Sequence, residues 1–207
     1  MKYYLKQGVF PFIYMLFMAI IAFGILIISG LLWLKIILAV LNIALYAVVV
    51  AAVSYKEGQE SVKVQHANDL ERMEIIRTGE NRPLKVHEEY KPWKGFTFGF
   101  AVCVPLIVLL ALHTILYLST GSYRGLGAIA GLVYFMFFVF FTFGAAASAG
   151  EAATGAALPW YSFYGALIAL PIVMLITGIA YLLGAKKIMR QYEIIQEKQR
   201  SIYGDKL

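Results

Sequence analysis

The chain has 207 residues, of which 61% are hydrophobic and only 14% are charged, and its formal net charge is +6. Soluble domains usually carry about 25% charged residues, so this composition excludes an ordinary soluble protein and predicts an all-α, polytopic membrane protein. Lys and Arg residues lie beside hydrophobic stretches, where they indicate orientation in the bilayer and not nucleic-acid binding. The single cysteine, Cys103, excludes an intrachain disulfide.

Two apolar stretches near the N-terminus are each long enough to cross a membrane as a helix. Residues 9–28 and 36–53 approach the ~20 residues that span ~30 Å of hydrocarbon. The first stretch is longer than a signal-peptide core and lacks a small-residue cleavage site, so we interpret it as a retained span. Residues 1–53 are therefore predicted to form a transmembrane hairpin, in which Asn42 is expected to hydrogen-bond to another helix.

A long polar segment, residues 54–95, separates the two apolar halves of the chain. Its first part, Ser54–Gly79, contains no proline and ends at a glycine, so the second span is expected to continue outward as one helix. Pro83 and Pro92 then favour extended chain. Acidic and basic residues are equal in number here, which argues against a basic lipid patch and favours a solvated, ion-paired cytoplasmic surface.

The second apolar block, residues 96–185, contains two clear spans at 96–118 and 161–183. A further span begins at Gly125, which brings the expected total to about five. The sequence leaves open whether residues 125–158 cross once, cross twice as short helices, or re-enter. Small residues dominate the second half of that region and permit close packing inside protein.

The tail, residues 186–207, is basic and has apolar residues at helical spacings, so an amphipathic helix is predicted. If both termini and the central segment are cytoplasmic, only Lys35 and Arg124 of the 18 Lys and Arg residues lie outside. Five spans would instead place the termini on opposite sides, with nearly balanced counts. The bias therefore favours an even number of crossings, with both termini at the cytoplasmic face of a plasma or inner membrane.

Two spans begin with a similar pattern, at residues 92–105 and 159–171. Each has a Pro-Trp pair, then a phenylalanine, then a glycine, and ends at a proline six residues later, which is Pro105 or Pro171. One interpretation is a weak internal duplication with the copies inverted, as in many transporters. The alternative is chance, because these residues are common at membrane interfaces and helix kinks.

A few polar residues inside apolar stretches are the candidates for chemistry. A carboxylate in an apolar stretch, such as Glu151, is costly unless it is paired, neutral or facing water, so Glu151 could mark an ion or proton path. The alternative is that Glu151 lies in an exposed loop between two spans. His113 is a second candidate on such a path, or else an ordinary interfacial hydrogen-bonding residue. Gly127 and Gly131 are interpreted as helix-packing positions, and Pro105 and Pro171 as kinks.

Sequence motifs do not point to an enzyme. Residues 125–130 match a dinucleotide fingerprint by letter, but no strand precedes them. Residues 86–90 lack the second histidine of a zinc-protease helix, so no metal, cofactor or catalytic residue is predicted. The leading hypothesis is an accessory or assembly subunit of a membrane complex, which binds lipid bilayer and a protein partner through Ser54–Gly79 and Lys186–Tyr203. The alternative is a small transporter or channel subunit, with a homo-oligomer as its expected form.

Overall fold

The structure, a computed structural model, describes residues 2–27, 32–79, 89–121, 129, 132–133, 136–137 and 160–203. These residues form the helices α1 (Lys2–Ile27), α2 (Leu32–Thr78), α3 (Lys94–Thr120), the 3-10 helix η2 (Trp160–Ile168) and α5 (Ala169–Tyr203). No strand occurs in these ranges, and the predicted all-α class is confirmed for them.

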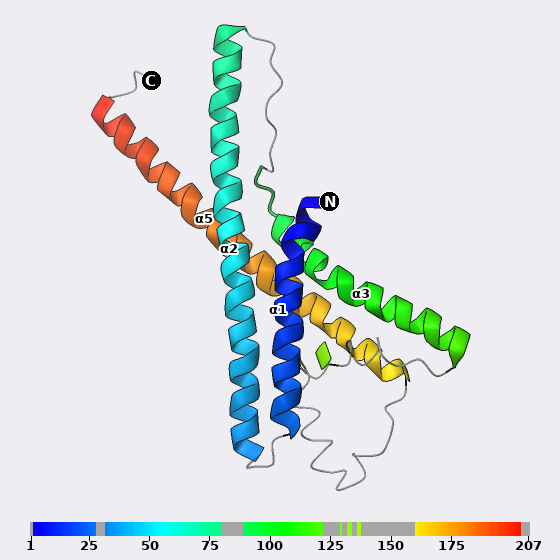
Figure 1. Ribbon diagram of the computed structural model, residues 1–207. Coiled ribbons are helices and arrows are strands. Elements are labelled where there is room, and N and C mark those ends of the chain that lie inside the picture. Colours follow the sequence, from blue (N-terminus) through cyan, green and yellow to red (C-terminus); the bar gives the residue numbers. More distant parts are fainter. Residues whose placement is uncertain are drawn as a thin grey trace.

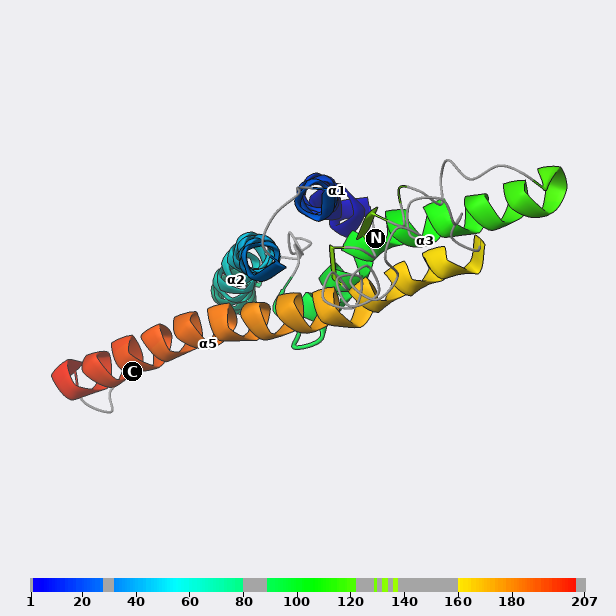
Figure 2. The same cartoon turned by 90° about the horizontal axis from the view of Figure 1, so that it is seen from below.

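The helices form two antiparallel pairs that cross each other (Figure 1). The first pair is α1 with α2, and the second is α3 with the first half of α5. Figure 2, which looks along α1 and α2, shows the α3–α5 pair lying across one side of the first pair. Contacts fix the antiparallel sense of the second pair: Gly95 lies against Tyr181, whereas Thr114, farther along α3, contacts Tyr164.

The two ends of this bundle differ in polarity. The start of α1, the polar half of α2 and the end of α5 lie at one end, while the end of α1, the start of α2, the end of α3 and the start of η2 lie at the other (Figure 1). We call the first the polar end of the bundle.

Four of these helices are long and apolar enough to cross a membrane. The qualifying segments are Gly8–Ile25, Trp33–Thr78, Lys94–Thr120 and Tyr164–Ser201. The predicted total of about five spans is not confirmed. The remaining expected span, residues 125–143, falls mostly outside the described residues, although Val133 and Met136 within it are fully buried.

α2 is one uninterrupted helix of 47 residues, apolar up to Val53 and polar beyond it. It ends because Gly79 adopts a left-handed conformation, with φ of +69°, and its N–H donates to the Ile75 carbonyl at 2.9 Å. Glycine alone takes this conformation without steric cost. The prediction that the second span continues as helix to Gly79 is confirmed.

The main core lies where the two pairs cross, and all four long helices contribute to it. Tyr46 of α2 lies at its centre, with its ring stacked on Tyr14 of α1 and edge-on to Phe137. Other members are fully or almost fully buried: Met15, Met18, Ala19, Ala22, Val50, Phe98, Val102, Cys103, Leu106, Leu110, Ala166, Ala169 and Val173.

Large apolar side chains also cover the outer faces of the spans. Phe10, Phe17, Val48 and Leu118 are among those exposed. A soluble protein rarely leaves such continuous apolar surface in water. These outer faces are compatible with insertion into lipid.

Candidate functional site

α2 and α5 cross in direct backbone contact at Gly58 and Gly184. A Cβ atom on Gly58 would overlap the carbonyl oxygen of Tyr181, and a Cβ on Gly184 would overlap that of Tyr55. Only glycine allows the two backbones to approach so closely. This crossing fixes the two polar helical extensions relative to each other.

The first turns of α3 pack into the same crossing through small residues. A Cβ on Gly95 would lie 2.5 Å from the Tyr181 Cβ, and one on Gly99 would lie 2.6 Å from the Met174 Cα. On the α5 side, Gly178 accommodates the Phe96 ring. Glycines four apart on one helix face are a common device for close helix packing in membranes.

A buried lysine occupies the centre of the crossing. Lys94 begins α3, and its side chain is only 3% exposed. Its Nζ donates to Ser61 Oγ at 3.0 Å and lies 3.7 Å from Glu57 Oε1, and both partners are on α2. A buried ammonium is costly without such partners, and it also opposes the positive end of its own helix dipole. Glu57 and Ser61 offset both costs.

Two tyrosine side chains, Tyr181 and Tyr90, lie beside this polar cluster. The Tyr181 hydroxyl is buried and faces Ser61 and the Lys91 backbone, but it forms no hydrogen bond of standard geometry with the described residues. The Tyr90 ring stacks on Tyr181, with 5.8 Å between centroids. This stacking holds Tyr90, which precedes α3, against α5.

The apolar-to-polar change falls at the same level on α2 and α5, and α3 begins close to it. On α2 the change follows Val53 and on α5 it follows Leu183, while Gly95 at the start of α3 lies against Tyr181. The crossing aligns the first two positions because Tyr55 touches Gly184. We call this level the boundary of the bundle.

Beyond the boundary, α2 and α5 diverge as two polar arms (Figure 1). We define the α2 arm as residues 54–78 and the α5 arm as residues 186–203. Near the crossing the arms pack together: Val62 and Ile188 are buried, and His66 stacks on Tyr192 with 4.2 Å between ring centroids.

The chain before α3 is tied to the α2 arm by ionic and amide contacts. Asn68 Nδ2 donates to Glu89 Oε1 at 3.1 Å. Arg72 donates to the same carboxylate and, at 2.9 Å, to Asp69. Arg72, Asp69 and Glu89 are partly exposed, so their ion pairs position the chain more than they stabilise the fold.

Farther out, the α2 arm presents large apolar side chains to solvent. Leu70, Met73 and Ile76 are 57%, 67% and 81% exposed. Ile194 and Ile195 of the α5 arm are also exposed. These residues lie on arms that are otherwise polar, so their exposure differs in kind from that of the outer span faces.

The residues singled out from sequence do not gather at this crossing. Asn42 is buried and donates from Nδ2 to the Met18 carbonyl of α1 at 2.9 Å. His113 is buried in α3, 6.2 Å from the Tyr117 ring. Pro105 lies inside α3, whereas Pro171 lies in the first turn of α5, directly after η2, where a missing N–H is tolerated.

Other predicted residues fall outside the described ranges. Glu151, Gly127 and Gly131 are among these, as is nearly all of the region 125–158 whose threading the sequence left open. The structure therefore does not bring Glu151 together with His113 or separate the two.

Sequence reasoning missed the residues of the crossing, including Lys94, Glu57 and Gly184. One signal was present: Gly95 and Gly99 are spaced four apart, directly after a lysine at the start of an apolar span. Their partners on α2 and α5 carry no comparable signal, because a single glycine or serine occurs in membrane helices of every kind.

Within the described ranges, no group of three or more His, Cys, Asp or Glu side chains is placed to hold a metal ion. No protein family, curated protein or solved structure matches this chain.

Proposed function

We propose that this chain is an integral membrane accessory or assembly subunit whose α2 and α5 arms hold a protein partner. The observation that carries the proposal is the exposure of Leu70, Met73 and Ile76 on the α2 arm. Exposed apolar surface on an otherwise polar element marks interaction sites in folded proteins.

The distance of these residues from the boundary argues that lipid does not cover them. Leu70 and Ile76 follow Tyr55 by 15 and 21 residues along one continuous helix. At 1.5 Å per residue they lie about 22 and 32 Å beyond it. Side chains so far outside the hydrocarbon require a protein surface if they are to be buried.

The partner is expected to present the apolar face of a helix. Leu70, Met73 and Ile76 recur at three-residue spacing on one side of α2, the pattern by which a helix is recognised. Glu74 and Arg77 are exposed beside them, so the partner rim should carry charges of both signs.

We further propose that the polar end faces the cytoplasm of a plasma or inner membrane. All but Lys35 and Arg124 of the 18 Lys and Arg residues belong to the N-terminal start, the central polar segment or the tail. Lys35 is at the start of α2, at the opposite end from the arms. The common placement of the described helix ends supports this orientation (Figure 1).

The test is site-specific photo-crosslinking in intact cells. A photoreactive residue at Met73 should form one discrete adduct with a different protein, and Leu70→Asp or Ile76→Asp should abolish it. The matched control is the same residue at Lys63, an exposed polar position on the same arm, which should form none. An adduct of twice the chain's mass would contradict the proposal by identifying a second copy as the partner.

The same experiment separates this proposal from transport. Glu151→Gln should leave the Met73 adduct unchanged, and deletion of Arg190–Leu207 should weaken it, because the deletion removes most of the α5 arm. Solute flux into proteoliposomes that vanishes in Glu151→Gln but survives the deletion would instead favour a transporter.

A further inference from the structure

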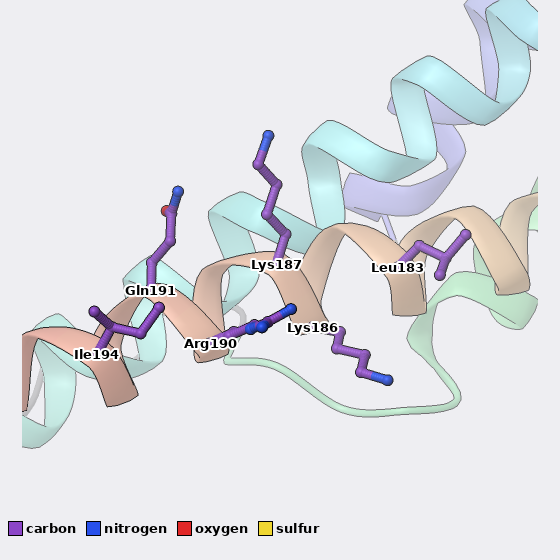
Figure 3. A pocket seen from close by; sticks show the side chains of 6 residues that line it. All are labelled: Leu183, Lys186, Lys187, Arg190, Gln191 and Ile194. Atoms are coloured by element: carbon purple, nitrogen blue, oxygen red, sulfur yellow. The ribbon is translucent and has the colours of Figure 1, made fainter. Parts of the chain in front are cut away.

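A basic groove lies on α5 just beyond the boundary (Figure 3). Its volume is about 330 Å³, and it is open because every lining residue comes from one helix. The lining residues are Leu183, Lys186, Lys187, Arg190, Gln191 and Ile194. Three of the six are cationic, one is an amide and none is acidic.

The side chains that line the groove come from successive turns of one helix. Lys187 and Gln191 project to one side of α5 and Lys186 to the other, with the Arg190 guanidinium between them (Figure 3). Lys187 Nζ also lies 6.0 Å from the centre of the Tyr55 ring on α2, at the limit of a cation–π contact. The Arg190 guanidinium can bind two phosphate oxygens at once, and the ammonium groups on either side of it add positive charge without converging on one point.

The position of the groove at the boundary indicates which phosphate compound it would bind. Leu183, at its inner edge, is the last exposed leucine before the α5 arm, and the first cation, Lys186, follows within one turn. Tyr55 of α2 lies against Gly184, and Trp93 directly precedes α3, whose Gly95 lies against Tyr181. Aromatic residues favour the headgroup region of a bilayer. A ligand with acyl chains could therefore lie along the apolar part of α5 while its phosphate occupies the groove.

We propose that this groove binds the headgroup of an anionic phospholipid of the bilayer leaflet at the polar end. The inference rests on the proposed membrane placement but not on the proposed protein partner. Charge balance in the central segment does not oppose it, because Glu57 of the crossing already lies beside Lys94 and no acidic side chain lines the groove.

The test uses the full-length protein in detergent micelles and native mass spectrometry of its lipid complexes. Phosphatidylglycerol should bind at least about tenfold more tightly than phosphatidylcholine. Each Lys or Arg near an anionic surface contributes about 1 kcal/mol, roughly fivefold in affinity, so Lys186→Gln/Arg190→Gln should weaken phosphatidylglycerol binding about 25-fold.

The matched control removes two charges elsewhere on the same arm, as Lys198→Gln/Arg200→Gln. These residues begin 12 positions beyond Lys186, about 18 Å along the helix, which exceeds the ~8 Å screening length at physiological salt. Less than a twofold loss is expected. The charge-preserving pair Lys186→Arg/Arg190→Lys should retain binding and so separates loss of charge from loss of fold.

Three results would overturn the proposal. Equal affinity for the two lipids would remove the headgroup preference. Equal losses in the groove pair and the control pair would indicate diffuse attraction and no site. Competition by glycerol 3-phosphate at the concentration of the lipid would assign the groove to a soluble phosphate. A Met73 adduct that persists in the groove pair would keep the protein-partner proposal separate from any of these failures.

Discussion

Gly58 and Gly184 meet where α2 and α5 cross, and each lies against a backbone carbonyl of the opposite helix. This reciprocal contact pairs Tyr181 with Gly58 and Tyr55 with Gly184, and the two arms diverge beyond it (Figure 1). The exposed apolar residues of the α2 arm and the basic groove of the α5 arm both take their positions from it.

Substitution at this contact should destabilise the fold. Gly58→Ala places a Cβ against the Tyr181 carbonyl, which is backbone and cannot rotate away, so the cost should lie in the upper part of the usual ~1–3 kcal/mol for overpacking. Alanine gains only ~1 kcal/mol in helix propensity. The net loss in unfolding from mixed micelles should therefore reach up to about 2 kcal/mol. Gly24→Ala is the control, since a Cβ there has nothing within 4 Å, and it should not lower stability. Equal stability of the two variants would contradict the contact.

Lys94 and Glu57 should contribute to the free energy of unfolding as one buried ion pair. Glu57→Gln leaves the Lys94 ammonium without its carboxylate, and breaking such a pair typically costs about 3–5 kcal/mol. The double variant Glu57→Gln/Lys94→Met removes both charges and should recover most of that loss. Additive effects in the double-mutant cycle would show that the two side chains do not interact.

The amide of Asn42 should hold α1 to α2. Asn42→Ala removes its hydrogen bond to the Met18 carbonyl, and such bonds in membrane proteins contribute about 1 kcal/mol. Ser54→Ala is a useful comparison, because among the described residues Ser54 Oγ donates only within its own helix, to the Val50 carbonyl. Stability measured in mixed micelles should fall in the first variant and change by less than half as much in the second.

Chemical labelling should place both arms on one side of the membrane. Cys103 is fully buried, so Cys103→Ala supplies a background for single reporter cysteines. Cysteines introduced at Lys63 and Lys198 should react with an impermeant reagent from the cytoplasmic side. A cysteine at Ser119, near the exposed end of α3, should react from the other side. Opposite sides for positions 63 and 198 would refute the proposed orientation.

Local patterns accounted for the helices but not for their meeting points. The continuation of α2 to Gly79 was predictable, because the absence of proline and the presence of a terminal glycine are features of the segment itself. The Asn42 amide was expected to bond across helices, yet Met18 could not be named as its acceptor. Residues 125–158 offered no turn signal strong enough to choose a threading.

The amino-acid sequence alone determined that apolar helices separate two polar segments, because hydropathy and helix propensity act over one or two turns. Only the tertiary structure decided that Lys94 lies between Ser61 and Glu57, that Gly58 meets Gly184, and that Leu70, Met73 and Ile76 stay exposed. Those outcomes depend on how far helices distant in sequence rotate, tilt and approach one another, and no local pattern encodes these quantities.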